Sequence, residues 1–227
     1  MAVVLADVFT AAVERLPADD NGRSHHRDPG LHLAEHLAVF VVRSVLSIDH
    51  ELVGSFFVHG ASDLHCHVHE FLGREFSSEA PPSEVMERGM ALWEARLEVM
   101  RSDPAANLAE LKSFGAWFGV GGADPAWRLH QLLEVLRLTG GRIDNRWRVL
   151  VTLEALADSF GSEALKAVRL LSKPTDETWE ILTGRDNIKG ILTIGLSHEG
   201  TRGEAEALVH ELGASGYTEF RSILDQH

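Results

Sequence analysis

The sequence predicts an all-α protein, and two patterns lead to this prediction. Apolar residues recur every three or four positions along nearly all of the chain, beginning with Val4, Val8 and Ala11, and this spacing places them on one face of a helix. The alternation of apolar and polar residues that marks a half-buried strand is almost absent. We therefore expect helices throughout the chain.

Capping signals indicate where individual helices begin and end. Asp103-Pro104 and Asp124-Pro125 each place a capping side chain before a proline, whose missing N–H costs nothing at the first helical position. Gly140-Gly141 is typical of a left-handed helix end. Dividing the periodic runs at such signals predicts helices at roughly 2–16, 31–47, 49–59, 62–76, 83–101, 104–119, 125–139, 144–160, 162–172, 176–184, 186–198, 202–213 and 217–225.

The connections between these helices are short, so we expect neighbouring helices to pack antiparallel as stacked helical hairpins. The one long polar interval, residues 17–30, is expected to be a flexible loop. Hydrophobic residues make up 44% of the chain and charged residues 24%, which is the composition of a globular protein. These features predict a single all-helical repeat domain over residues 1–227, either a solenoid of hairpins or a compact helical array.

Several helical runs share the same pattern of packing residues: "LAELKSFGAWF", "WRLHQLLEVLRLTGGRI", "RVLVTLEALADSFGSEALKAVRLL" and "GEAEALVHELGASGYTEFRSIL". They resemble the irregular helical repeats of the HEAT and armadillo type, in which stacking buries an apolar face that one hairpin cannot bury alone. The order of helices over residues 31–225 also resembles the carboxy-terminal helical region of large bacterial multidomain proteins. This resemblance implies a scaffold, or the recognition part of a larger bacterial system, and identifies no catalytic residue.

Charge and hydropathy limit the partners and the compartment. The formal net charge of −13 opposes a general affinity for nucleic acid, which draws on clustered Lys and Arg. The longest apolar run, Leu37 to Val42, is far shorter than the roughly 20 residues that span a bilayer. The amino terminus lacks the basic start of a secretory signal, and the single Cys66 cannot form an internal disulfide. We expect a cytoplasmic protein without a membrane segment.

Nine of the thirteen histidines lie between His25 and His69. In the stretch "DLHCHVH", residues 63–69, a strand would place His65 and His67 on one side, which resembles the metal-binding strand of amidohydrolase and phosphoesterase barrels. A helix instead aligns Leu64, Val68 and Leu72 as an apolar stripe. The helix accounts for the flanking residues, so we expect a solvent-exposed, histidine-rich helix that is titratable near neutral pH.

A second histidine motif offers an alternative function. His32, Glu35 and His36 match H-x-x-E-H, and the surrounding segment resembles the zinc-binding helix of pitrilysin-type and insulinase-type metallopeptidases. The resemblance implies that His32 and His36 bind zinc, that Glu35 is the general base, and that Glu110 is the third ligand. The helical context of residues 37–110 favours an ordinary core helix without a metal. A zinc-dependent hydrolase therefore stays the alternative.

A compact basic group surrounds one tryptophan. Arg142, Arg146 and Arg148 lie beside Trp147, and these four residues are the candidates for contact with a partner, because tryptophan and arginine often anchor protein interfaces. The remaining tryptophans are expected to pack between helices. The sequence as a whole predicts a non-enzymatic helical scaffold or protein-interaction module that uses no cofactor and binds a protein partner.

Overall fold

The computed structural model describes residues 29–78, 81–119, 122–173 and 184–226. Every regular element in these ranges is a helix: eleven α-helices and one 3-10 helix. The all-α prediction is thus confirmed for this part of the chain. No helix within it is long and apolar enough to cross a membrane. The helix predicted at 2–16, and nearly all of the one at 176–184, lie outside the described residues.

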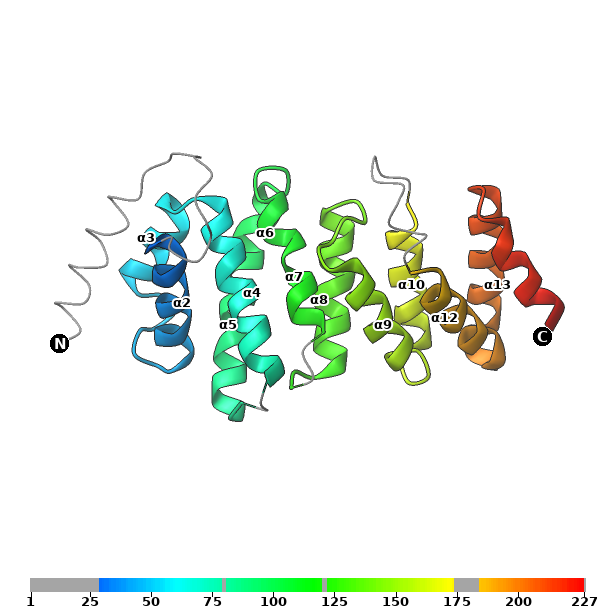
Figure 1. Ribbon diagram of the computed structural model, residues 1–227, viewed down its shortest axis with the longest axis horizontal. Coiled ribbons are helices and arrows are strands. Elements are labelled where there is room, and N and C mark those ends of the chain that lie inside the picture. The colour runs from blue at the N-terminus through cyan, green and yellow to red at the C-terminus, as the bar shows by residue number, and fades with distance from the viewer. Residues whose placement is uncertain (1–28, 79–80, 120–121, 174–183, 227) are drawn as a thin grey trace. The chain divides into compact units, whose positions relative to one another are not determined.

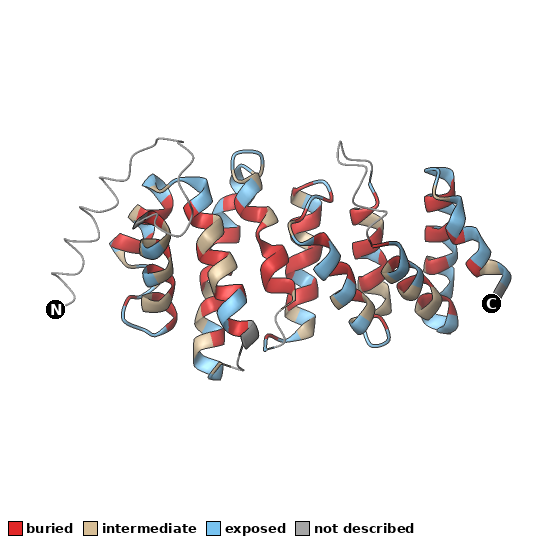
Figure 2. Ribbon diagram, in the orientation of Figure 1, coloured by how far each residue is buried: buried red, intermediate tan, exposed pale blue. Residues whose placement is uncertain are grey.

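The helices, which are labelled in Figure 1, group into two compact units by their contacts. Of the described residues, the first unit comprises 29–78, 81–113 and 122, and the second comprises 114–119, 123–173 and 184–226. Figure 2 shows that most helices carry buried residues on one side and exposed residues on the other, as the helical spacing of apolar residues predicts.

The first unit contains α2 (Pro29–Val42), α3 (Glu51–His59), α4 (Ser62–Ser78), α5 (Ser83–Ser102) and α6 (Leu108–Lys112). α2 packs against α4 and α5, and α4 also packs against α5 and α6. His65 of α4 also contacts α3 at Phe56, so α4 meets every other helix described in this unit. Its fully buried side chains include Val68 and Leu72.

The second unit contains α7 (Phe114–Phe118), α8 (Pro125–Leu138), α9 (Arg146–Leu156), α10 (Gly161–Leu171), α12 (Arg185–Ser197), α13 (Glu199–Ala214) and the 3-10 helix η2 (Thr218–Gln226). α9 packs against α7, α10 and α12. α10 packs against α8, α12 and α13, and α13 also packs against α12 and η2. The inward residues of α9 and α10 are almost entirely aliphatic, for example Val149, Leu153 and Leu165, each with 0% exposure.

Two of the capping signals act as the sequence predicts. The side chain of Asp124 accepts a hydrogen bond of 3.1 Å from the backbone N–H of Trp127, with Pro125 as the first residue of α8. After α8, Gly140 and Gly141 have φ of 66° and 93°, and the N–H of Gly141 donates to the carbonyl of Leu136 at 2.8 Å. This bond satisfies a helix-end carbonyl that has no partner within the helix.

The single helix predicted at 104–119 is wrong in extent. The side chain of Asp103 accepts from the N–H of Ala106 at 3.0 Å, but this bond belongs to a turn, and α6 begins only at Leu108. α6 and α7 are then separated at Ser113, whose hydroxyl donates to the carbonyl of Glu110 at 2.7 Å. A serine side chain that bonds to a carbonyl one turn earlier competes with the backbone donors that would continue the helix.

The predicted loop at 17–30 is too long by two residues at its end. Residues 17–28 lie outside the described part of the chain, whereas Pro29 is the first residue of α2 and Gly30 is buried within it. Proline is well suited to a first helical position because the N–H it lacks has no helical acceptor there. Proline here begins the helix and does not belong to the loop.

Candidate functional site

The histidine-rich segment 63–69 lies in α4, so the helix prediction is confirmed and the strand with His65 and His67 side by side is wrong. His65 and His69 are one turn apart and both contact Glu110, whereas His67 contacts Glu35. The expected solvent exposure is also wrong for two of the three histidines, because His65 is 7% and His69 0% exposed.

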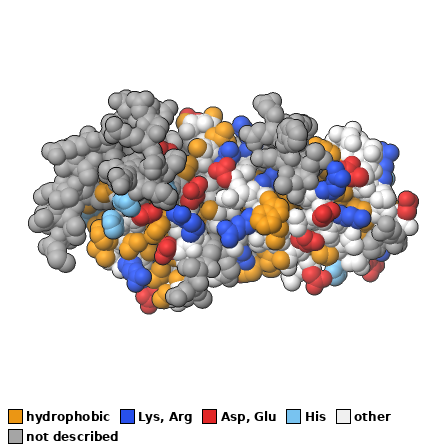
Figure 3. Space-filling model, viewed as in Figure 1, with side chains coloured by type: hydrophobic (Ala, Val, Ile, Leu, Met, Phe, Trp, Pro, Cys, Tyr) orange, Lys and Arg blue, Asp and Glu red, His pale blue; other side chains and the backbone are white. Residues whose placement is uncertain are grey.

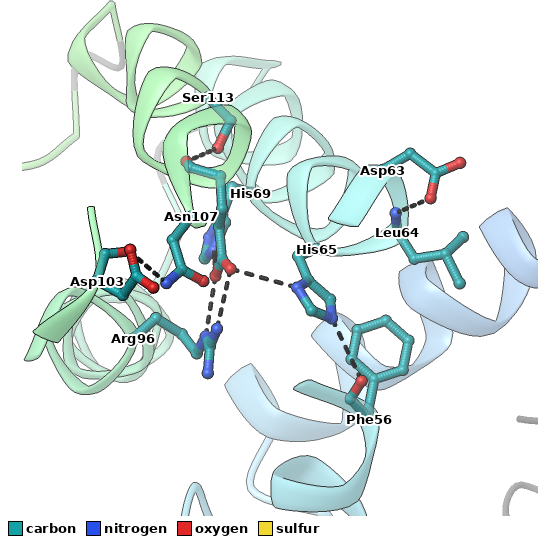
Figure 4. Close-up of polar contacts among 10 residues, drawn as sticks. Phe56, Asp63, Leu64, His65, His69, Arg96, Asp103, Asn107 and Ser113 are labelled. Atoms are coloured by element: carbon teal, nitrogen blue, oxygen red, sulfur yellow. Dashed lines mark hydrogen bonds and ion pairs between the residues drawn. The ribbon is translucent and has the colours of Figure 1, made fainter. Parts of the chain in front are cut away.

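Glu110 of α6 is the centre of a buried polar group that we call the Glu110 cluster: Glu110, Arg96, His65 and His69 (Figure 4). Arg96 of α5 donates through Nε to Oε1 and through Nη2 to Oε2, both at 2.9 Å. His69 Nε2 lies 3.0 Å from Oε1, and His65 Nδ1 lies 3.3 Å from Oε2. Side chains of α4 and α5 thus meet at one carboxylate of α6.

Aromatic rings enclose the Glu110 cluster. The guanidinium carbon of Arg96 lies 4.2 Å from the ring centroid of Phe57, and the same ring lies 5.1 Å from that of His65. The ring of His69 meets Trp93 edge-on at 5.0 Å. Low-polarity walls strengthen the electrostatic attraction within the group and raise the cost of any unpaired charge.

Glu110 keeps its charge despite its burial. Burial by itself would raise the pKa of Glu110, but the hydrogen bonds from Arg96, His65 and His69 outweigh it and hold that pKa well below its ordinary value. A carboxylate offers about four lone-pair positions, and these three side chains direct four nitrogen atoms at it. The arrangement therefore leaves Glu110 no acceptor position for a substrate or a metal ion.

His65 also connects the cluster to α3. Its second ring nitrogen, Nε2, lies 3.3 Å from the carbonyl oxygen of Phe56, so both ring nitrogens face an acceptor. His65 thus links α3 to the carboxylate of α6. His69 differs, because its Nδ1 has no hydrogen-bond partner within the described part of the protein.

The H-x-x-E-H residues lie on α2 and are arranged around Glu35. The Oε2 of Glu35 lies 3.5 Å from Nδ1 of His32, and its Oε1 lies 3.1 Å from Nε2 of His67. Burial would raise the pKa of Glu35, but the hydrogen bond and charge of His67, followed by those of His32, hold it below its ordinary value. His36 stacks on the ring of Phe40, with 6.3 Å between centroids.

These positions do not assemble the zinc site that the motif implies. Among residues 29–78, 81–119, 122–173 and 184–226, no group of three His, Cys, Asp or Glu side chains is arranged to hold a metal ion. Glu110, the expected third ligand, has Arg96 across both of its oxygens. Within the described chain, Glu35 instead joins His32 to His67 of α4.

The tryptophan and arginine residues proposed for partner contact lie on α9 and in the turn before it. Trp147 is 59% exposed, and Arg142 and Arg148 are exposed as well. Arg146 is the exception: it is 6% exposed, and its Nη2 donates to the carbonyl oxygen of Leu171 at 2.5 Å. Arg146 therefore ties α9 to the end of α10, and its assignment to a partner surface is wrong.

Two residues of the Glu110 cluster and of α9 are not predicted from the sequence. Arg96 lies within the apolar stripe of α5, between Trp93 and Met100, and a charged residue in such a stripe indicates a buried ionic partner. Val151 lies one turn after Trp147 on the outward side of α9 and is 39% exposed. Its position opposite the inward Val149 and Leu153 was the signal that could have found it.

Comparison of the chain with protein-family models, with curated proteins and with solved structures finds no match. The HEAT-like and armadillo-like resemblance therefore stays a prediction.

Proposed function

We propose that this protein is a non-enzymatic helical scaffold that binds another protein through the outward side of α9. The observation that carries the proposal is Trp147, a tryptophan residue with 59% exposure. Trp93 and Trp117 are fully buried, and the half-buried Trp127 packs against the rings of Phe114 and Trp117. Trp147 has no ring contact within the described residues, and an exposed tryptophan of this kind is typical of an interface anchor.

The packing of the second unit supports a repeat-like scaffold. α9 contacts α7 on one side and α12 on the other, while α10 contacts α8 and α13. Helices that alternate in this way form two layers, which is the arrangement that stacked hairpins of the HEAT type would produce. In such a layer the outer side of each helix is free to bind a partner.

The Glu110 cluster supports a structural role for the most unusual ionisable group of the first unit. A general base needs an acceptor position that faces its substrate. Glu110 directs both oxygens at Arg96 and the two histidines, and its exposure is 1%. We infer that this carboxylate holds α4, α5 and α6 together, and that it takes no part in a reaction.

Site-specific photo-cross-linking in the native cell tests the proposed function. A benzophenone amino acid is placed at Ala155, an exposed residue on the outward side of α9, which leaves Trp147 intact. We expect one defined protein adduct, and we expect Trp147→Ala in the same chain to remove it. The control position is Val99, which is 53% exposed in the first unit. Equal adducts at both positions, or none at Ala155, would overturn the proposal.

A metal analysis tests the zinc-hydrolase alternative directly. Protein purified without an affinity tag is compared with its His32→Ala, His36→Ala variant. We expect no stoichiometric zinc in either preparation, since Glu110 is already bound by Arg96. Stoichiometric zinc that the variant loses while it keeps its helical circular dichroism would contradict the non-enzymatic proposal.

A further inference from the structure

Helix α9 has apolar residues on two opposite sides. Its inward side buries Val149, Leu150 and Leu153, each with 0% exposure. At about 100° per residue, its exposed residues fall in one narrow outward stripe: Trp147, Arg148, Val151 and Ala155. We call these four residues the α9 stripe. A helix that is apolar on both sides is expected to be covered on both sides.

Exposed apolar side chains are few in the described residues, and α9 contributes two of them. The large hydrophobic residues with substantial exposure are Val45, Val58, Val99, Trp147 and Val151. Only Trp147 and Val151 are neighbours on one helix, four residues apart, where side chains lie one above the other. Figure 3 shows a hydrophobic patch on the face of the second unit that contains α9, with charged side chains around it.

Two positively charged side chains near Trp147 in the sequence, Arg142 and Arg148, have no ion-pair partner in the described part of the chain. Within the described part of the chain, the guanidinium of Arg148 forms neither a hydrogen bond nor an ion pair, and that of Arg142 bonds only to the carbonyl oxygen of Thr139, at 3.0 Å. Elsewhere in the second unit Arg169 bonds to Glu211 at 2.7 Å. Within the described residues, Arg148 of the α9 stripe and the preceding Arg142 thus lack the carboxylate partner found for Arg169.

Arg148 packs against its own unit, and the α9 stripe contributes no negative charge of its own. The aliphatic part of Arg148 lies against Gly119, where an added Cβ would be 3.2 Å from its Cδ. The α9 stripe itself contains no acidic residue, and the nearby Glu154 accepts a hydrogen bond of 2.7 Å from Asn187. An incoming carboxylate therefore meets no negative charge within the stripe itself.

We propose that the α9 stripe binds an acidic amphipathic helix of another protein. The inference rests on the proposed protein-binding function and names the class of partner. The apolar side of the partner helix covers Trp147 and Val151, and its Asp or Glu side chains pair with Arg148 and Arg142. An outward helix between two neighbours offers the ridges and grooves that receive another helix, and carboxylate binding by arginine is bidentate and charge-assisted.

The same charges disfavour two other occupants. In a twofold contact between two copies of this chain, each α9 stripe would meet itself, which would bring the Arg148 side chains together. Nucleic acid would meet a chain with a net charge of −13, and two unpaired guanidinium groups offer few phosphate contacts. An acidic helix matches both the apolar and the charged part of the stripe.

Selection from a random peptide library tests the proposal without a known partner. Peptides of about 16 residues, long enough for four helical turns, are selected on the full-length protein, and the winners are synthesised and titrated by fluorescence anisotropy. We expect winners with net negative charge and apolar residues at spacings of three and four. Their affinity should fall at least tenfold with Trp147→Ala and with Arg148→Glu, and it should weaken as salt is raised.

Matched control variants separate the α9 stripe from general surface effects. Val99→Ala removes another exposed apolar residue, and Arg202→Glu reverses an exposed arginine of α13 that has no ion pair in the described part of the chain. Both controls should change the affinity less than twofold. Circular dichroism and the melting temperature should be the same in all four variants, because the altered side chains are exposed.

Each other outcome overturns a defined part of the proposal. If the selected peptides are basic or uncharged, the partner is not acidic. If their affinity is unchanged by Trp147→Ala and by Arg148→Glu, the α9 stripe is not the binding site, although the protein still binds peptides. A dimer that dissociates with Trp147→Ala makes a second copy the occupant. If no peptide is enriched, the proposal of an acidic helix as partner is wrong. The cross-linking experiment at Ala155 then tests separately whether α9 binds a protein at all.

Discussion

Glu110 carries a negative charge in the core of the first unit because side chains from α4 and α5 direct N–H donors at it. The sequence places Glu110 among possible metal ligands, because its separation along the chain from the H-x-x-E-H motif suits a third ligand. The sequence gives no other information about this glutamate. What decides its role is Arg96, fourteen residues earlier. A contact between two helices depends on how the helices pack, and spacing along one helix does not reveal it.

Removing the charge of Glu110 should destabilise the fold strongly. Glu110→Gln leaves Arg96 buried without its counter-charge, and breaking a buried pair in this way costs about 3–5 kcal/mol. Urea unfolding followed by circular dichroism measures the free energy of unfolding. Glu98→Gln is the matched control, because the side chain of Glu98 is 72% exposed in its pair with Arg101. Its free energy of unfolding should change by less than about 0.5 kcal/mol. Equal effects would contradict the buried-pair interpretation.

The same carboxylate predicts how stability depends on pH. The pKa of Glu110 is lower in the folded protein than its ordinary value of 4.5, so its contribution is fully present above that value and is lost as the pH falls toward the folded-state pKa. The stability difference between the native protein and Glu110→Gln should therefore shrink as the pH falls below about 4.5. Unfolding measured from pH 7 to 3 checks this, and a difference unchanged at pH 3 would rule it out.

Helix boundaries show which features of an element are local. The start of α8 at Pro125 and the glycine end after it follow from side chains a few residues away, and the sequence predicts both. The break at Ser113 involves a single hydroxyl bond inside an apolar run, which the spacing of apolar residues does not show. The outward side of α9 is likewise apolar, and only the packing of its neighbours reveals which of its two apolar sides is buried.

The contact between α7 and the turn before α9 predicts the effect of a single methyl group. A Cβ at Gly115 would lie 1.8 Å from the backbone carbonyl oxygen of Asp144, so Gly115→Ala must displace the backbone and should cost about 1–3 kcal/mol. The matched control is Gly203→Ala in α13, where an added Cβ meets no atom within 4 Å. That control should stabilise the protein, by up to about 1 kcal/mol, because alanine favours helix over glycine. Chemical unfolding of both variants measures the difference, and similar effects would contradict the close approach.

At the scale of the whole molecule, the sequence predicts one helical domain, whereas the contacts group the helices into two compact units. The helical periodicity that predicts the fold class is the same on both sides of Ser113, so it contains no signal for such a grouping. In arrays of helices, the free energy of unfolding is approximately the sum of the stability of each repeat and of the interfaces between neighbouring repeats. Parts of such an array can therefore unfold separately. Whether the two units unfold together therefore depends on how strongly they stabilise each other.

Hydrogen exchange measured by mass spectrometry distinguishes one cooperative domain from two. Glu110→Gln removes a charge that binds α4, α5 and α6 of the first unit, so amide exchange should accelerate in α4 and α5 while α10 and α13 keep their protection. Gly115→Ala acts at α7 of the second unit, and it should accelerate exchange in α9 and leave α4 unchanged. The two variants are each other's controls, because their expected patterns are opposite. Separate cores would confine the effect of each substitution to its own unit. If either substitution instead accelerates exchange by the same factor in both units, the chain unfolds as the single domain that its sequence predicts.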